Sequence, residues 1–170
     1  RPDSGPTTTT REASLSHDFG GFEPCEQAPA ILAKLALRYG IEGQDLAGHR
    51  FWQRPGQRSI WVASSPALPP VGVEVQGFGM LAMRKGPPAG CMTNSFLRRF
   101  GHLAIRSVYT LSSAELGLVL RGQPIAVEPQ ATGDGPCILR TELGVVGRGR
   151  IRGAILVGEL PRGVRSATAG

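Results

Sequence analysis

The residues with the clearest chemical potential are three arginines that alternate with glycine or isoleucine in the segment GVVGRGRIRG. Arg148, Arg150 and Arg152 stand two positions apart, so a β-strand would project all three side chains from one face. Such a row could follow a nucleic-acid backbone, with each guanidinium neutralising about one phosphate. It could equally form a solvated outer face that protects a sheet edge from aggregation. Periodicity alone favours neither interpretation.

The glycines of the same segment raise the alternative of a loop that cradles a cofactor phosphate. A P-loop requires a Gly-Lys-Ser/Thr step, and a dinucleotide site requires a different glycine spacing; both lead into a helix. Here the apolar run AILVGEL follows, and its length and composition are typical of a strand. We therefore expect no cofactor.

Nucleophilic and metal-ligating side chains are scattered along the chain. The three cysteines are odd in number and lack the spacing of a metal site or a disulfide framework. Cys91 precedes a helix cap that could stabilise a thiolate, but no general base accompanies it. His17, His49 and His102 have no acidic or cysteine neighbour at ligand spacing. We expect neither a catalytic residue nor a metal site.

Aromatic residues offer a second possible contact with nucleic acid. Phe51, Trp52 and Trp61 could stack on bases. They occur in short runs with strand-like patterns, and aromatic residues on paired strands are more often core residues. We therefore predict a packing role for them.

The bulk composition favours an acidic partner. The chain of 170 residues carries 19 basic and 13 acidic side chains, for a net charge of +6, and nucleic acid is the commonest partner of such proteins. The bias towards arginine over lysine has less meaning, because a genome rich in G and C produces the same bias. No apolar run approaches the roughly 18 residues of a membrane span, and no signal-peptide pattern is present. We expect a cytoplasmic protein with no membrane partner.

Composition also divides the chain into parts. Residues 1–18 are rich in Pro, Ser and Thr and are predicted to be a disordered lead-in. An α+β domain is predicted over 19–110 and a small, mostly β module over 111–166, followed by a tail at 167–170. The fold class is therefore α+β.

Local patterns place the elements of the first domain. APAILAKLALRYG has helical spacing and a glycine stop at Gly40. Arg50–Gln53 and Ser59–Ala63 form a predicted hairpin around a Pro-Gly turn. A long β-type run that is broken by glycines is expected over Val71–Arg84, with a short helix in TNSFLRRFG and a further strand in LAIRSVYTL.

The second module begins with a predicted helix in SSAELGLVLRG. Ser112 and Glu115 have the spacing of a capping box, and the helix should end at Gly122. Four short strand-like runs follow, separated by turn residues: PIAVEP, GPCILRTE, GVVGRGRIRG and AILVGEL.

The order of these motifs resembles the C-terminal region of RsmF-type (Sun-family) rRNA cytosine-5 methyltransferases. That family closes with a PUA-like RNA-binding domain, in which a helix ends in Arg-Gly, a Gly-any-Gly-Lys step follows, and the domain finishes with Pro-Lys-Gly-Leu-Arg. The corresponding residues here are Arg121-Gly122, then Gly147, Gly149 and Arg150, then Pro161-Arg162-Gly163-Val164-Arg165. Upstream, RYGI, IWVA, VQGFGMLAMRK and TNSFLRRFG occur in the order of the family's linker domain. The resemblance covers roughly residues 22 to 165.

The resemblance implies a PUA-like β-barrel module that binds structured RNA, with ribosomal RNA as the expected target. Its RNA-binding residues would be Arg148, Arg150, Arg152, Arg162 and Arg165, with Arg98 and Arg99 from the short helix. Gly147, Gly149 and Gly163 would allow close backbone approach or unusual dihedral angles. Relatives carry Lys-Asn where this chain has Val157-Gly158, which removes a cation from that turn.

Three functions follow from these observations. The first is a non-catalytic RNA-binding module, because the sequence contains no glycine fingerprint for a methyl donor and no pair of catalytic cysteines. The second is a fragment or in-trans subunit of an RNA cytosine-5 methyltransferase, with that enzyme's catalytic domain as a partner. The third is a protein–protein adapter in ribosome assembly whose basic surface serves solubility.

Overall fold

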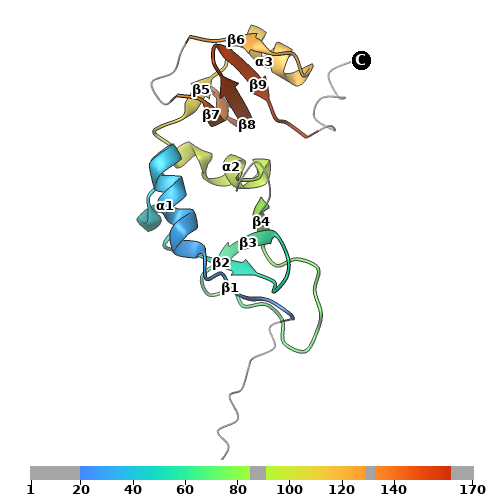
Figure 1. Cartoon of the computed structure of the whole chain (residues 1–170). Coiled ribbons are helices and arrows are strands. Elements are labelled where there is room, and N and C mark those ends of the chain that lie inside the picture. The colour runs from blue at the N-terminus through green and yellow to red at the C-terminus, as the bar shows by residue number, and fades with distance from the viewer. Residues whose placement is uncertain (1–19, 85–90, 129–132, 162–170) are drawn as a thin grey trace, which may run out of the picture.

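The computed structural model describes residues 20–84, 91–128 and 133–161. The predicted lead-in and tail lie outside these residues. The described part contains three α-helices and two sheets, which confirms the mixed α+β class (Figure 1). No described helix combines the length and the apolar character needed to cross a membrane.

The N-terminal sheet is antiparallel with strand order β1-β2-β3-β4. Its strands are β1 Glu23–Pro24, β2 His49–Gln53, β3 Ser59–Ser64 and β4 Met80–Arg84. The predicted hairpin is confirmed, because β2 and β3 pair in register with Trp52 opposite Trp61. Gly56 in the connecting turn has a φ of 74°, a conformation that glycine adopts without the steric cost of a Cβ.

The β-type run predicted over Val71–Arg84 is wrong for most of its length. Only Met80–Arg84 forms a strand, and residues 71–79 are irregular. Gly72 and Gly79 have φ values of 74° and 71°, which extended strands do not allow. The apolar residues of this segment cover the sheet instead of forming a strand, since Val75 and Phe78 pack on its outer face.

Two helices cover the opposite face of this sheet. Helix α1 spans Ala28–Tyr39 and ends at Gly40, which is left-handed with φ 68°, as predicted. Helix α2 spans Asn94–Phe100 and begins at Thr93, whose hydroxyl accepts a hydrogen bond from the amide of Phe96. Short 3-10 turns follow each helix at Gly43–Leu46 and Gly101–Leu103.

The aromatic residues considered for base stacking are core residues. Phe51, Trp52 and Trp61 are all buried. Trp52 and Trp61 pack with Phe22 on the outer face of the sheet, and Phe51 packs with the helices on the inner face. This result confirms the packing interpretation.

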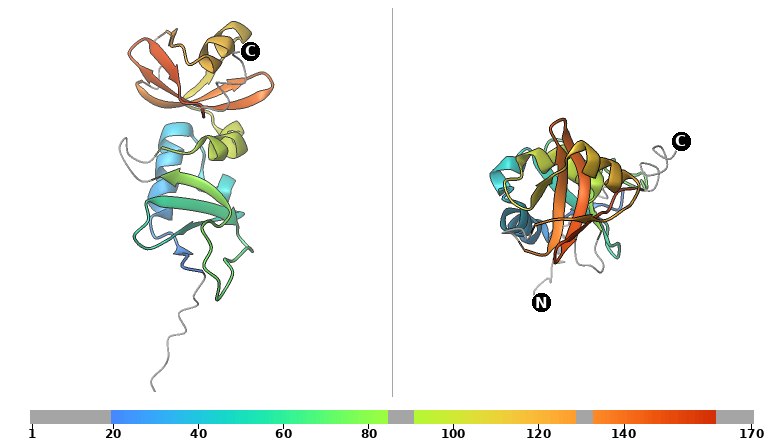
Figure 2. Two further views of the ribbon diagram at one scale, coloured as in Figure 1. Left: turned by 90° about the vertical axis from the view of Figure 1, so that its right-hand side faces the viewer. Right: turned by 90° about the horizontal axis from the view of Figure 1, so that it is seen from above.

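The C-terminal sheet has strand order β5-β7-β8-β9-β6 and curls into a half-barrel (Figure 2). Its strands are β5 Val108–Thr110, β6 Ile125–Ala126, β7 Gly135–Thr141, β8 Gly144–Arg152 and β9 Ile155–Gly158. Strand β5 pairs with β7 in parallel, and the other pairs are antiparallel. The sheet therefore includes residues that precede position 111.

Helix α3, Ser113–Leu120, begins at the predicted capping box. The Ser112 hydroxyl accepts from the amide of Glu115, while the Glu115 carboxylate accepts from the amide of Ser112. The Tyr109 hydroxyl also donates to Glu115, at 2.7 Å. Burial and this hydrogen bond raise the pKa of Tyr109 to about 12, so the phenol remains a donor across the neutral range.

Replacing Ser112 by alanine should lower the free energy of unfolding by about 1 kcal/mol, because the helix loses its N-terminal acceptor. Urea titration followed by circular dichroism measures this change. Ser113→Ala is the matched control, since Ser113 is the first helical residue and exposed. Equal effects of the two substitutions would contradict the capping role.

The two halves share a hydrophobic core. Ile138 of β7 is fully buried and belongs to the cluster that contains Phe96 and Phe100 of α2. Helix α2 accordingly lies between the two sheets (Figure 1). The other face of the C-terminal sheet packs on α3 around Leu139, Leu156 and Val119.

Candidate nucleic-acid interface

Strand β8 carries the predicted row of arginines. Residues 147, 149 and 151 of this strand are buried, whereas Arg148, Arg150 and Arg152 alternate with them. The strand and the common orientation of its arginines are therefore as predicted. The arginines lie on the face of the sheet that also carries Ile138, because Arg148 is opposite Ile138 in the pairing of β7 and β8.

Helix α2 lies along this strand and extends the row. The Arg98 side chain donates from Nε to the carbonyl of Val146 at 2.9 Å. Arg98 thus lies beside the beginning of β8, and Arg152 is at its end. The stretch from Val146 to Arg152 spans roughly 20 Å along an extended strand, so the candidate interface is a line of guanidinium groups rather than a single pocket.

The acidic residue Glu159, which no sequence motif marks, lies within the row of arginines. Glu159 follows β9, and its carboxylate pairs with Arg148 at 2.5 Å and Arg150 at 2.8 Å. The Glu159 side chain is only 26% exposed. Two guanidinium groups therefore share one carboxylate, which leaves one net positive charge at this position.

Arg148 is held mainly by the protein itself. Its Nη1 donates to the carbonyl of Met92, and its backbone amide donates to Asn94 Oδ1 at 2.6 Å. Asn94 Nδ2 in turn donates to the carbonyl of Glu159. These contacts join α2 to β8 and to the end of β9, so Arg148 is better explained as a residue that connects the two halves than as an RNA ligand.

The charge state of this cluster is fixed at neutral pH. Burial alone would favour protonation of Glu159, but the Arg150 hydrogen bond and the charges of Arg148 and Arg150 outweigh it and lower the Glu159 pKa. The hydrogen bond to Glu159 raises the pKa of Arg150. The guanidinium of Arg150 also donates from Nη2 to Cys91 Sγ at 3.5 Å, so its orientation is restrained by two partners.

The glycines of the Gly-any-Gly step have internal packing partners. A Cβ at Gly147 would overlap Asn94 Oδ1 and lie 2.7 Å from Leu160 Cδ2. A Cβ at Gly149 would lie 2.8 Å from Leu139 Cδ2. Neither residue has a positive φ, so close approach within the protein accounts for both glycines. Gly163 lies outside the described residues.

The remaining predicted arginines differ in their surroundings. Arg152 and Arg98 are exposed at the two ends of the row. Arg99 is exposed next to Arg98, with its guanidinium 5.7 Å from the centre of the Phe100 ring. Arg162 and Arg165 lie outside the described residues.

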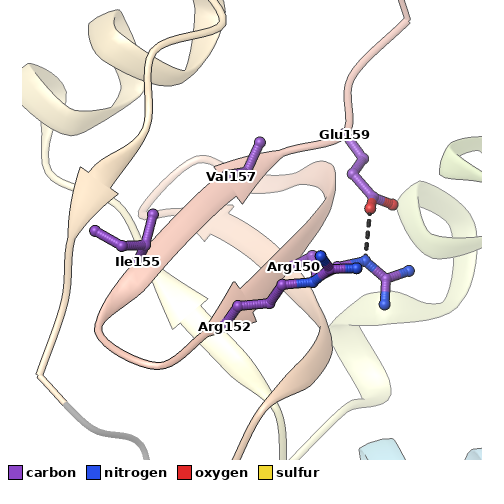
Figure 3. Close-up of a pocket in the computed structure, with 5 residues that line it drawn as sticks. All are labelled: Arg150, Arg152, Ile155, Val157 and Glu159. Carbon is purple, nitrogen blue, oxygen red and sulfur yellow. Dashed lines mark hydrogen bonds and ion pairs between the residues drawn. The ribbon is translucent and has the colours of Figure 1, made fainter.

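A groove opens at the end of the row near Arg152. It has a volume of about 450 Å³ and is lined by Arg150, Arg152, Ile155, Val157 and Glu159 (Figure 3). Ile155 and Val157 come from β9 and are 46% and 43% exposed. Val157 and Gly158 occupy the two positions where the resemblance would have Lys-Asn. A Cβ at Gly158 would lie 2.5 Å from Val119 Cγ1 of α3. Packing of α3 thus accounts for the glycine at this position.

The described residues contain no group of His, Cys, Asp and Glu side chains that could hold a metal ion. Burial raises the pKa of Cys137 to about 12, so this thiol stays protonated. Within the described part of the chain, the chemistry of the site is therefore that of fixed cations beside an apolar surface. A comparison of the chain with protein-family models and with curated proteins found no match.

Proposed function

We propose that the protein is a non-catalytic RNA-binding module that contacts the backbone of structured RNA along strand β8. The observation that carries this proposal is the line of guanidinium groups from Arg98 to Arg152, which ends in an exposed arginine on each side. Arginine contacts phosphate through several donors in a rigid fork. Arg99, Arg150, Arg162 and Arg165 complete the proposed set.

The acidic groups around the line leave it positive. Glu159 is shared by two arginines, and Asp134 accepts a hydrogen bond from the amide of Gly153 just beyond Arg152. The overall charge of +6 adds a long-range attraction for polyanions. These features support phosphate recognition as the main source of affinity.

We further propose that the C-terminal sheet and α3 form a PUA-like module related to RsmF-type rRNA methyltransferases. The support is the order of elements: a helix with Arg121 as its C-cap, a Gly-any-Gly step within β8 and a following β9 strand. Structured ribosomal RNA is then the proposed target, and a methyltransferase catalytic domain, in the same chain or in trans, is a proposed partner. Reconstitution of cytosine-5 methylation with such a domain tests this relation.

Replacing Arg98, Arg99 and Arg152 together by alanine should weaken binding to a structured rRNA fragment about tenfold at low salt. If these side chains neutralise three phosphates, the magnitude of the slope of log affinity against log salt should fall by about 2–3. Filter binding over a salt series measures both quantities. Arg148 is left intact because its removal would disturb the connection between the two halves.

A matched triple variant, Arg50→Ala, Arg58→Ala and Arg84→Ala, removes the same charge from exposed positions in the N-terminal half. Its salt slope should stay near that of the unchanged protein. Equal slopes for the two triple variants would contradict an interface along β8, and absence of a salt-dependent affinity in the unchanged protein would contradict RNA binding altogether.

A protein–protein adapter is the second candidate, and one observation favours it. Leu37 and Ile105 are each 78% exposed. Both lie near Gly40 at the end of α1: Leu37 precedes it by three residues, and a Cβ at Gly40 would overlap the Ile105 side chain. Exposed apolar side chains of this kind occur at protein interfaces. Pull-down of ribosome-assembly proteins that survives nuclease treatment and fails with Leu37→Ser and Ile105→Ser would support this function.

A further inference from the structure

We infer that the groove beside Arg150 and Arg152 accepts the base of one unpaired nucleotide, with its phosphate on Arg152. This inference rests on the proposed function and adds to it. Phosphate contacts along β8 would position the RNA without reading its bases, whereas the groove would distinguish an unpaired nucleotide from a continuous duplex.

The floor of the groove is apolar and accessible. Ile155 and Val157 lie on β9 at alternate positions, so both side chains are on the same face of the sheet. They are 46% and 43% exposed, whereas the alternating residues of the same strand, Leu156 and Gly158, are buried on its other face. A flat base placed over them would remove this apolar surface from water.

The guanidinium group of Arg150 is fixed in one orientation. Its Nε donates to Glu159 and its Nη2 to Cys91, so two donors on different sides of the group are restrained. Unpaired RNA bases commonly stack on guanidinium planes. Because Arg150 is already ordered, a ligand would not bear the entropy cost of ordering it.

Arg152 supplies the remaining cation. It lines the groove, is exposed, and comes from the same strand face as Arg150 (Figure 3). Arg150 shares the carboxylate of Glu159 with Arg148, whereas no carboxylate among the described residues lies within ion-pair distance of Arg152. The groove therefore presents one uncompensated cation next to an apolar floor, which matches the phosphate and base of a nucleotide.

The volume of about 450 Å³ is within the usual range for small-molecule sites, roughly 300–1,000 Å³. The groove is open to solvent, as continuation of an RNA chain on both sides of the bound nucleotide requires. A free mononucleotide has the same chemistry, so the experiment separates the two sources.

The test uses the full chain and a short RNA stem-loop that carries one fluorescent purine analogue as an unpaired base in its loop. A second RNA has an abasic site at that position. Val157→Asp removes the apolar floor and places a carboxylate beside the phosphate position. Leu143→Asp is the matched control: it also replaces an aliphatic residue by aspartate, at a fully exposed position in the turn between β7 and β8.

The intact RNA should bind the unchanged protein and Leu143→Asp about tenfold more tightly than the abasic RNA, as expected for one stacked base. Val157→Asp should bind both RNAs equally and should not change the fluorescence of the analogue. Ile155→Asp, on the same floor, repeats the measurement if Val157→Asp does not fold.

Equal affinities of the intact and abasic RNAs for the unchanged protein would overturn the inference and leave RNA binding in place. Absence of binding to either RNA would overturn the proposed function as well. Half-saturation by adenosine or uridine monophosphate at a lower concentration than by the RNA would identify a free nucleotide as the ligand and would also overturn the inference.

Discussion

Replacing Asn94 by alanine should lower the free energy of unfolding by about 2–4 kcal/mol. The side-chain amide satisfies two backbone groups at once, because Oδ1 accepts from the amide of Arg148 and Nδ2 donates to the carbonyl of Glu159. Each buried group left without a partner costs about 1–3 kcal/mol. The lost hydrogen bonds would weaken the contact between α2, β8 and the end of β9.

Urea titration can follow both halves of the molecule in this experiment. Trp52 and Trp61 lie in the N-terminal sheet, so their fluorescence reports on that half, while circular dichroism reports on both. Ser95→Ala is the matched control, since Ser95 is exposed on the same helix and should change stability by less than about 0.5 kcal/mol. An unchanged midpoint for Asn94→Ala would disprove the importance of this connection.

Glu159→Gln should change stability and RNA affinity in opposite directions. Loss of the carboxylate shared by Arg148 and Arg150 should lower the free energy of unfolding by about 1–2 kcal/mol, a value reduced for partial solvent exposure. The same change leaves two uncompensated cations beside the proposed phosphate path. RNA affinity should therefore rise severalfold at low salt, with a steeper salt slope.

The stabilising effect of Glu159 should also depend on pH. Its pKa in the folded protein is lowered from the ordinary value of 4.5, so its contribution is fully present above that value. It is lost as the pH falls below 4.5 and through the folded pKa. The stability difference between Glu159→Gln and the unchanged protein should consequently shrink in this acidic window.

Glu142→Gln removes the same charge from an exposed position in the turn between β7 and β8. It should change neither the urea midpoint nor the acid dependence of stability appreciably, because surface charges contribute little. Lower RNA affinity for Glu159→Gln than for this control would contradict a phosphate path along β8.

Local sequence patterns predicted most elements of the fold. The stop at Gly40, the cap at Ser112 and the hairpin around Gly56 are each determined by nearby residues, so short-range rules suffice for them. The short-range rules mispredicted segment 71–79 as extended, because its apolar residues pack on the outer face of a sheet and the local pattern does not show this packing.

The arginine row was predictable, but its internal neutralisation was missed. Glu159 lies on the far side of a hairpin turn from Arg148, so no pattern within a single strand connects them. The hairpin register was an available signal. Arg152 and Ile155 pair on either side of the turn, and counting outward from this pair places residue 159 opposite residue 148. The hydrogen bond from the Glu159 amide to the Arg148 carbonyl follows this register. Asn94 offered no such signal, because its role depends on how α2 docks.

The parallel pairing of β5 with β7 determines where the chain can be divided. A cut before Ser112 would remove β5 and leave the β7 edge with unpaired backbone groups, and it would expose Ile138, which is fully buried against α2. Bare strand edges and exposed core residues promote aggregation. The half-barrel is therefore not expected to fold when it is moved into another protein by itself. The smallest unit that could be transferred, by design or by gene recombination, would have to include α2 and β5.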